Sequence, residues 1–160
     1  MDSARITEIL TDPVTLELVD RQPITQIGYA AADGSPRAVP VGYLLREGKF
    51  VFFTIPSSDK VAALHRDPRI ALTIDAYPPP CCLLVRGTTE LREEDGVPEE
   101  YLQASFRTMP EDERGAFEQQ VRALYDSMVR VVVTPSWVRL NDFQRTAPRA
   151  VDRLVQAKQG

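Results

Sequence analysis

The sequence predicts a mainly β protein, an antiparallel barrel or strongly bent sheet with helices packed on its outside. Three observations support this prediction. Most segments with strand character alternate apolar and polar residues, as half-buried strands do. Short turns rich in Gly, Pro and Asp join the early segments, as in hairpins. The helical segments are few and amphipathic, so they can cover a sheet but cannot replace it.

Length and charge limit the classes of protein. The chain has 160 residues, of which 43% are hydrophobic, so we expect one domain over 1–160 with a packed core. We place the core at about 14–142, and 143–160 as a C-terminal tail. The net charge of −4 disfavours a general nucleic-acid binder, because that function needs a basic face.

The cellular compartment is predicted from what the sequence does not contain. The N-terminal segment MDSARITEIL lacks the basic and apolar regions of a signal peptide, and no apolar run is long enough to span a bilayer. The two cysteines, Cys81 and Cys82, are adjacent and cannot build a disulfide framework. We therefore expect a cytoplasmic protein without a membrane partner.

Six segments have strand character. The first three are joined by turns at Asp33–Pro36 and Arg46–Gly48, which predicts an antiparallel meander. Gly87 predicts a bend in the fifth segment, and Pro135 an interruption in the sixth. The six segments are 24–32, 37–45, 49–55, 69–76, 81–92 and 129–140.

Helical spacing predicts the remaining elements. A short helix begins at Asp2 or Ser3 and ends at Asp12-Pro13, and a second covers 58–67 with Ser57 as its cap. Two further helices fall between the last two strands, one starting near Pro98 and one carrying an apolar stripe from Phe117 to Met128. A loose helix follows Pro148.

The segment 49–55 is apolar on both of its faces. Phe50 and Phe52 lie on one face, and Val51, Phe53 and Ile55 on the other. A strand of this kind needs two apolar partners. One is the barrel core, and the other is either a helix of the same chain or a second subunit. The second alternative predicts a homodimer, because soluble monomers rarely expose such a patch.

A strand, a polar turn and a helix follow one another around Ser57, Ser58 and Lys60. The free amides at a helix N-terminus attract anions, phosphate above all, and the two hydroxyls add donors. Lys60 lies in the first helical turn, where a cation opposes the helix dipole unless an anion binds there. The segment predicts a phosphate site; the alternative is an ordinary capped helix with a solvated lysine.

Arg37 begins the second strand segment in phase with Val39 and Val41. If that strand pairs with 49–55, the guanidinium can approach the same phosphate site, where its planar fork suits phosphate. Pro40 in mid-strand implies an edge or a bulge, which leaves backbone groups free to meet a ligand. The alternative is a surface arginine after a turn.

No catalytic residue can be assigned from the sequence. His65 is the single histidine, so neither a histidine metal site nor a Ser-His-Asp triad can be argued, and no metal is expected. Cys81 and Cys82 fit packed thiols, and Trp137 fits either stacking on a ligand or core packing. An enzyme whose cofactor supplies the chemistry fits this pattern, and so does a binding protein.

The order and spacing of several short motifs resemble one family. These are A-D-G-S-P-R-A-V-P-V over 32–41, G-K-F-V-F-F-T over 48–54, Lys60, and L-H-R-D-P-R-I-A-L over 64–72. Together they resemble the pyridoxamine 5′-phosphate oxidase-like, FMN-binding split barrels, most strongly over 24–92 and again over 129–142. The resemblance implies a six-stranded antiparallel split barrel that forms a homodimer.

The resemblance also implies a cofactor and its site. Members of the family bind FMN or the deazaflavin coenzyme F-420 in clefts between the subunits and act on small molecules. The phosphate ligands would be Arg37, Lys60 and Ser57 or Ser58, the strand 39–41 would lie along the ring system, and Thr54 would line the ribityl or phosphate region. The residues implied to bind cofactor are Arg37, Val39, Pro40, Val41, Phe53, Thr54, Ser57, Ser58, Lys60 and Trp137.

Three functions follow from this site. The first is an FMN-dependent oxidoreductase, but not the vitamin B6 enzyme itself, because the C-terminus lacks that enzyme's arginine-containing substrate motif. The second is a reductase that uses coenzyme F-420, whose longer acidic tail would need further cations such as Arg66 and Arg69. The third is a flavin- or haem-binding module without activity, with His65 as the histidine available to haem.

Overall fold

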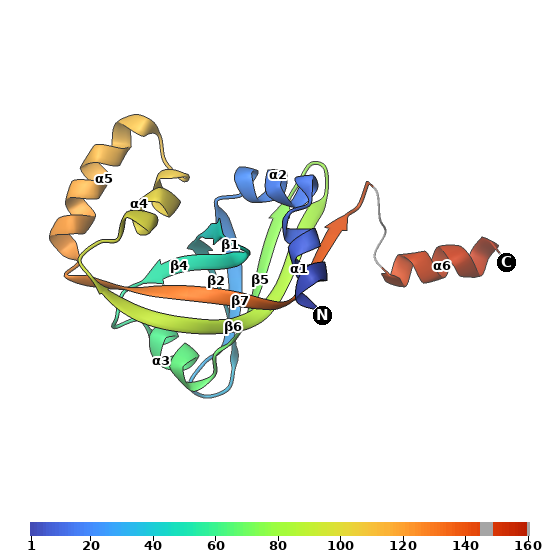
Figure 1. The fold of residues 1–160 in the computed structure, drawn as a ribbon, viewed down its shortest axis with the longest axis horizontal. Coiled ribbons are helices and arrows are strands. Elements are labelled where there is room, and N and C mark those ends of the chain that lie inside the picture. Colours follow the sequence, from blue (N-terminus) through green and yellow to red (C-terminus); the bar gives the residue numbers. More distant parts are fainter. Residues whose placement is uncertain (145–148, 160) are drawn as a thin grey trace.

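The protein is mainly β, with seven strands in one antiparallel sheet and helices around it (Figure 1). The computed structural model describes residues 1–144 and 149–159, and none of the helices there is long and apolar enough to cross a membrane. The sheet order is β2-β1-β5-β6-β7-β4-β3. The strands are β1 (Ile24–Ala30), β2 (Pro36–Gly42), β3 (Leu44–Arg46), β4 (Lys49–Thr54), β5 (Arg69–Ala76), β6 (Cys81–Asp95) and β7 (Ser127–Asp142).

Tyr43 closes the sheet into a barrel. β2 and β3 are the two edge strands, yet Tyr43 is the one residue between them. Because consecutive Cα atoms are about 3.8 Å apart, the two edges must come within roughly 8 Å of each other. The barrel is confirmed, but with seven strands instead of six, because the predicted strand 37–45 divides at Tyr43. The first part pairs with β1 and the last three residues pair with β4.

Arg107 holds the chain at this closure. Its guanidinium donates to the carbonyl oxygens of Tyr43, at 2.8 Å, and of Val19 and Asp20, and it lies over the Tyr43 ring at 5.5 Å. The Tyr43 ring is fully buried against Phe50, and burial raises the pKa of its hydroxyl. One side chain therefore joins the closing residue to the N-terminal part of the chain.

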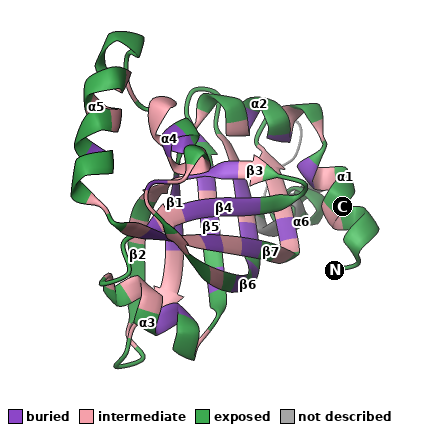
Figure 2. Ribbon diagram, turned by 60° about the vertical axis from the view of Figure 1, so that its left-hand side comes forward, coloured by how far each residue is buried: buried purple, intermediate pink, exposed green. Residues whose placement is uncertain are grey.

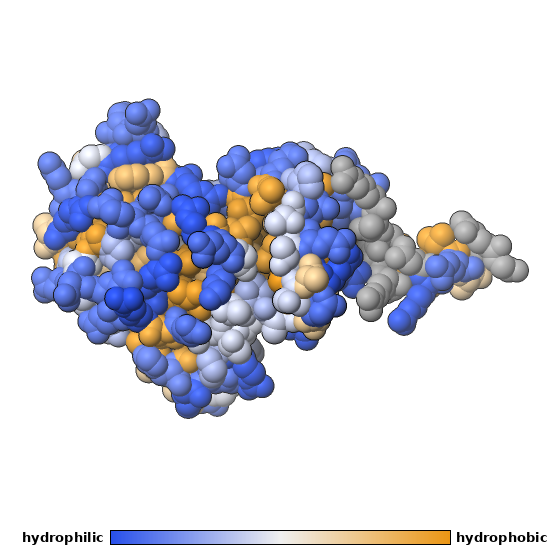
Figure 3. Space-filling view, viewed as in Figure 1, coloured by the Kyte–Doolittle hydropathy of each residue, from blue (hydrophilic) through white to orange (hydrophobic). Residues whose placement is uncertain are grey.

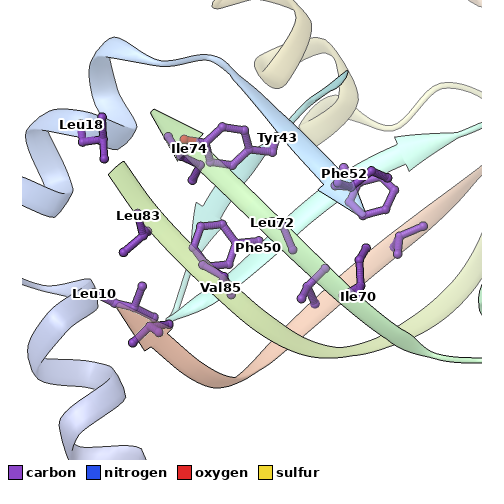
Figure 4. Close-up of a cluster of buried hydrophobic side chains, with 14 of the residues drawn as sticks. Leu10, Leu18, Tyr43, Phe50, Phe52, Ile70, Leu72, Ile74, Leu83 and Val85 are labelled. Carbon is purple, nitrogen blue, oxygen red and sulfur yellow. The ribbon is translucent and has the colours of Figure 1, made fainter. Parts of the chain in front are cut away.

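The main core fills the barrel (Figures 2 and 4). Alternate residues of the strands point inward, among them Ile27, Phe50, Phe52 and Leu72, all of which are fully buried or nearly so. Leu10 and Leu18 reach the same cluster from two N-terminal helices. Burying each of these large side chains contributes roughly 1.5–3 kcal/mol, so the strand alternation seen in the sequence is the main determinant of the barrel.

Helices α1 to α5 lie around the barrel, whereas α6 extends away from it (Figure 1). The sequence predicts all of the helices except α2. The pair Asp12-Pro13, which predicts the end of the first helix, in fact begins α2. The Asp12 carboxylate accepts from the Val14 amide at 2.8 Å and Pro13 occupies the first turn, so this pair begins a helix. The helices are α1 (Ser3–Leu10), α2 (Pro13–Arg21), α3 (Asp59–Arg66), α4 (Glu99–Phe106), α5 (Glu111–Leu124) and α6 (Arg149–Gln159).

Helix α4 covers the second apolar face of β4. Phe53 contacts Tyr101 of α4 edge-on, with ring centroids 6.1 Å apart, and Val51 is 1% exposed. Phe53 and Tyr101 pack with residues of α5 into a second apolar cluster. The chain itself therefore supplies the partner that this face needs. Of the two alternatives, a helix of the same chain covers Phe53, while Ile55 on the same face is exposed, and the homodimer stays a prediction.

A β-bulge lies between β6 and β7. After it, each residue of β7 points to the face of the sheet opposite to the one that the earlier alternation would give it. Arg86 pairs with Trp137 and Gly87 with Pro135, so Ser136 is an extra residue. Val131 and Val133 point into the barrel before the bulge, and Val138 after it. Without the extra residue Trp137 would point inward; with it, Trp137 lies on the outer face beside Arg86.

Gly87 is the residue that makes this bulge feasible. A Cβ atom at Gly87 would lie 2.4 Å from the Thr134 carbonyl oxygen, a distance that real side chains do not adopt. The close approach is of backbone to backbone, so no flexible side chain can move away. The bend predicted at Gly87 and the irregularity predicted at Pro135 are thus confirmed, and both belong to the same β-bulge.

Replacing Gly87 with Ala should destabilise the protein by about 2–3 kcal/mol, because the strands must separate at the bulge to admit the methyl group. Gly115→Ala is the matched control: Gly115 lies inside α5 with nothing near its Cβ position, so the same change should stabilise by roughly 0.5–1 kcal/mol. Urea unfolding followed by circular dichroism measures both. Equal effects of the two substitutions would contradict the role given to Gly87.

Candidate functional site

The residues predicted to bind a cofactor lie in four places. Thr54, Ser57, Ser58 and Lys60 surround the turn from β4 to α3, and Val39, Pro40 and Val41 lie on β2. Arg37 and Trp137 line a separate cleft. Phe53 packs against α4.

The turn into α3 has the backbone of an anion site. Ser58 caps the helix: its hydroxyl accepts from the Lys60 amide at 3.4 Å, and its carbonyl accepts from the Val61 amide at 2.9 Å. The cap is thus one residue later than predicted, and Ser57 lies before it, exposed. The Lys60 and Val61 amides of the first turn are thus bonded to Ser58, which leaves the Asp59 amide as the first-turn donor for a ligand.

Lys60 is the cation of this turn. Its side chain is half-buried, and it forms no salt bridge with any residue in the described part of the chain. It lies at the positive end of the helix dipole, where an ammonium group is unfavourable unless an anion shares the site. Thr54, at the end of β4, is 8% exposed and forms the base of the turn. The residues therefore suit a phosphate group.

β2 is an edge strand with open backbone. Val39 and Val41 are half-buried and Pro40 is exposed, with Pro40 opposite Gln26 of β1. This confirms the edge position that Pro40 predicted. Arg37 pairs with Tyr29 of β1, so the predicted pairing of the arginine with 49–55 is wrong. Only β3, further along the same segment, pairs with β4.

A cavity of about 890 Å³ lies on the outer face of β1, β5, β6 and β7; we call it the arginine cleft. Three arginines line it, one each from β2, β5 and β6, together with Trp137 of β7. Lys60 and the two serines of the α3 turn do not line it. The cleft is defined here by Gly28, Arg37, Arg69, Ala71, Arg86 and Trp137.

One row of residues crosses the sheet along the base of the arginine cleft. Gly28 pairs with Ala71, Ala71 with Arg86, and Arg86 with Trp137, so the four lie side by side on neighbouring strands. The Arg86 guanidinium carbon lies 4.3 Å from the centroid of the Trp137 ring, a cation–π contact. Two small residues thus form a flat floor, and a stacked Arg–Trp pair stands at its side.

The other arginines near the cleft differ in their partners. Arg69 forms a two-bond pair with Asp67, at 2.6 and 2.9 Å, and this hydrogen bonding lowers the pKa of the Asp67 carboxyl to about 2. Arg66 donates to the carbonyls of Ala31 and Ala32 and so fixes the β1–β2 turn. Arg37 and Arg86 form no salt bridge with described residues.

The remaining reactive side chains lie elsewhere. His65 is exposed in the last turn of α3, at the end opposite Lys60. Cys81 and Cys82 are free and half-buried at the start of β6, and burial raises the pKa of the Cys81 thiol. Within residues 1–144 and 149–159, no group of three or more His, Cys, Asp or Glu could hold a metal ion.

Arg86 is the site residue that the sequence analysis missed. The alternation in 81–92 already puts it on the face opposite Val85 and Gly87, which are buried. Its neighbour Trp137 could not be placed beside it, because simple alternation along β7 directs Trp137 into the barrel. The signal was the pair Gly87 and Pro135, which together indicate a bulge.

Comparison of the sequence with family models gives a match to the model of pyridoxamine 5′-phosphate oxidase over residues 11–141. This range includes all seven strands up to Asn141 and both the α3 turn and the arginine cleft. Among the curated proteins, no sequence matches the chain.

Three solved structures illustrate the shared fold. An F-420 reductase is 22% identical with a TM-score of 0.62, over 77% of this chain and 94% of that one. An FMN-binding, pyridoxamine 5′-phosphate oxidase-related protein of Nostoc punctiforme is 14% identical with a TM-score of 0.59, over 83% and 84%. The haem storage protein HutZ of Vibrio cholerae is 12% identical with a TM-score of 0.59, over 80% and 92%.

The two serines of the α3 turn should differ in their effect on stability. Ser58→Ala removes the helix cap and should cost about 1 kcal/mol of unfolding free energy. Ser57→Ala removes an exposed hydroxyl and should change it by less than about 0.5 kcal/mol. Thermal and urea unfolding of the two variants test this. A larger loss for Ser57→Ala would show that the cap is misassigned.

Proposed function

Because the chain belongs to the pyridoxamine 5′-phosphate oxidase family, we propose that it is an FMN-dependent oxidoreductase acting on a small organic molecule. The observation that carries this proposal is the α3 turn, in which a half-buried lysine without a salt-bridge partner in the described residues stands at the positive end of a helix. When bound, the flavin supplies the redox chemistry. The chain supplies binding, orientation and exclusion of water.

The α3 turn would hold the cofactor phosphate. Lys60 supplies the charge, the Asp59 amide and the Ser57 hydroxyl would supply donors, and Ser58 keeps the helix end in place by accepting from the Lys60 and Val61 amides. Thr54 lines the base of the turn. These groups suit a phosphate because they combine a point charge with several convergent hydrogen-bond donors.

β2 would lie along the flavin ring. Along Val39, Pro40 and Val41 the edge position leaves the backbone groups of alternate residues unpaired on the side away from β1, and these can contact the polar edge of a ring. Arg37, at the start of the same strand, lines the arginine cleft and adds a guanidinium there. Trp137, from a partner chain, would contact the ring, whereas Phe53 is packed against α4.

Coenzyme F-420 is a second candidate cofactor. The observation that favours this cofactor is that Arg69 and Arg86 line the arginine cleft together with Arg37. An acidic tail that continues from a phosphate near Arg37 would meet cations there. Arg66 does not take part in this, since its guanidinium is bonded to the β1–β2 turn.

A homodimer would complete the site. The cofactor groups on β2 and α3 face outward from the barrel, so a second chain is needed to cover the ring. The chain also exposes an apolar stripe on α6, formed by Val151, Leu154 and Val155 at helical spacing (Figure 3). A second copy can bury this stripe, because two-fold association covers self-complementary surfaces.

Purified protein should bind FMN, and Lys60→Met should weaken binding by tenfold or more, about 1.4 kcal/mol, because the phosphate loses its charged partner. Lys49→Met, an exposed lysine at the start of β4, is the matched control and should bind normally. Flavin fluorescence quenching measures both. Equal affinity of the two variants would overturn the assignment of the α3 turn.

The same titration with coenzyme F-420 chooses between the cofactors, and tighter binding of F-420 would replace FMN in the proposal. Reduction of the bound cofactor by nicotinamide or deazaflavin donors then tests for activity. Bound flavin that no donor reduces, with no electron acceptor turned over, would make the protein a binding module.

Light scattering at micromolar concentration should give a mass near twice 17.9 kDa. Truncation before α6 should shift the equilibrium toward the monomer if the α6 stripe lies in the interface, and should lower cofactor affinity with it. A stable monomer that binds FMN at full strength would contradict the shared site.

A further inference from the structure

We propose that α6 of one chain packs on the outer face of α5 of a second chain, and that two copies exchange this contact reciprocally about a two-fold axis. The proposal rests on the homodimer proposed above, and it names the surface that the α6 stripe contacts. Three features support it: exposed apolar residues on both helices, opposite charges, and the places of the two helices in the molecule.

The outer face of α5 can accept a helix. Phe117 and Val121 turn another side of α5 into the second apolar cluster. Ala116, Ala123 and Leu124 are exposed, Leu124 by 63%, and their spacing of seven and eight residues puts them on one side of the helix. The two alanines let a second helix approach closely, and Leu124 offers apolar area. We call this surface the α5 face and define it by Asp112, Glu113, Ala116, Ala123 and Leu124.

Helix α6 presents a surface that matches the α5 face. Leu154, in the α6 stripe, is 62% exposed, and α6 extends away from the barrel, so the stripe is open to a second chain (Figure 1). Lys158 lies on the same side of α6 as the stripe, because it follows Val151 by seven residues and Leu154 by four. The side of α6 that is open thus ends in a cation.

Charge favours the pairing of α6 with α5. Helix α6 contains three basic residues and one acidic residue, whereas 90–126, which includes α5, contains eleven acidic and four basic residues. Asp112 and Glu113 in the first turn of α5 are exposed, and so is Lys158. None of these three forms a salt bridge with another described residue. Opposite charges of this kind steer the two surfaces together and fix their orientation.

The charges set the two helices antiparallel. Lys158 in the last turn of α6 then lies beside Asp112 and Glu113 in the first turn of α5, and the negative end of one helix dipole meets the positive end of the other. Val151 lies toward Ala123 at the far end of the contact. Val151 and Lys158 are about 10.5 Å apart along α6, and Glu113 and Ala123 about 15 Å apart along α5. The long side chain of the lysine spans the difference.

The places of the two helices require a second chain. Helices α5 and α6 lie at opposite ends of the longest axis of the molecule, so α6 does not reach α5 of its own chain (Figure 1). A two-fold axis across the long axis puts the α5 end of each chain beside the α6 end of the other. Both contacts then form together, and the assembly closes as a dimer.

An exchange of charges tests the contact. Lys158→Glu and Glu113→Lys each put like charges together twice in every dimer, so each should raise the dimer dissociation constant tenfold or more in light scattering at low ionic strength. An equal mixture of the two variants should restore the dimer, because one contact of the mixed pair is reversed in charge and the other is the natural one. Lys49→Glu, at an exposed lysine outside both helices, is the matched control and should behave as the wild type.

Three exposed leucines test the apolar part of the contact. Leu154→Gln and Leu124→Gln should each raise the dimer dissociation constant tenfold or more, because each removes apolar area from both contacts. Leu16→Gln is the matched control: Leu16 is 49% exposed on α2, outside the contact, and its replacement should leave the constant unchanged. Urea unfolding curves show that each variant is folded.

A wild-type dimer that none of these variants weakens would overturn the contact between α6 and α5 and leave the proposed homodimer standing. Failure of the mixture of Lys158→Glu and Glu113→Lys to restore the dimer would also overturn it. So would assemblies that grow beyond the dimer with concentration, since the contact would then not close.

A membrane surface is the other partner that the test detects. Binding of the wild type, but not of Leu154→Gln, to phosphatidylserine vesicles, with an unchanged dimer in that variant, would overturn the proposal in favour of a lipid surface. A monomeric wild type would remove both the contact and the homodimer. The FMN titration of Lys60→Met is independent of all these results and still tests the cofactor site.

Discussion

The contact between Gly87 and the Thr134 carbonyl is the constraint on which the candidate site depends. The two backbones approach so closely that no side chain fits between them, and Ser136 is accommodated as an extra residue directly after Pro135. The bulge changes the face on which Trp137 lies while Val138 resumes the core alternation. The barrel keeps its packing, and the outer face gains an indole ring beside a guanidinium.

The closure of the barrel and the cover of β4 are both supplied within the chain. Its closure at Tyr43 is secured by Arg107, and the outer side of β4 is covered by α4. Tyr101, Phe106 and Phe117 pack against one another above this strand, with ring centroids 6.2 and 6.5 Å apart. Residues of the same chain pack against the outer apolar side of β4. A dimer would therefore serve the cofactor site, where one chain leaves the ring of a flavin uncovered, and not the core.

The sequence predicts the strands well because half-buried strands repeat every two residues, and the barrel follows from their number and turns. Prediction from the sequence fails where a single residue decides the structure. The division of 37–45 at Tyr43 leaves the alternation intact and is decided by which edges meet, a property of the closed barrel. Helix α2 was missed because Asp12-Pro13 is a stop signal for one helix and a start signal for the next. The α3 turn was predicted from local chemistry alone, whereas the Arg86–Trp137 pair joins residues 51 positions apart and depends on the bulge.

The α3 turn and the arginine cleft of this acidic protein offer different chemistry, and the difference indicates what each could select. At the α3 turn a lysine and backbone donors converge on one point, which suits a tetrahedral phosphate whatever is attached to it. In the arginine cleft the charge is planar, stacked on an indole and set beside a flat floor, so a ligand gains most when its anionic group lies in the plane of a ring. A phosphate without a ring would satisfy the first site and leave the floor of the second empty. The α3 turn and the arginine cleft therefore differ in the shape of the anion that each favours.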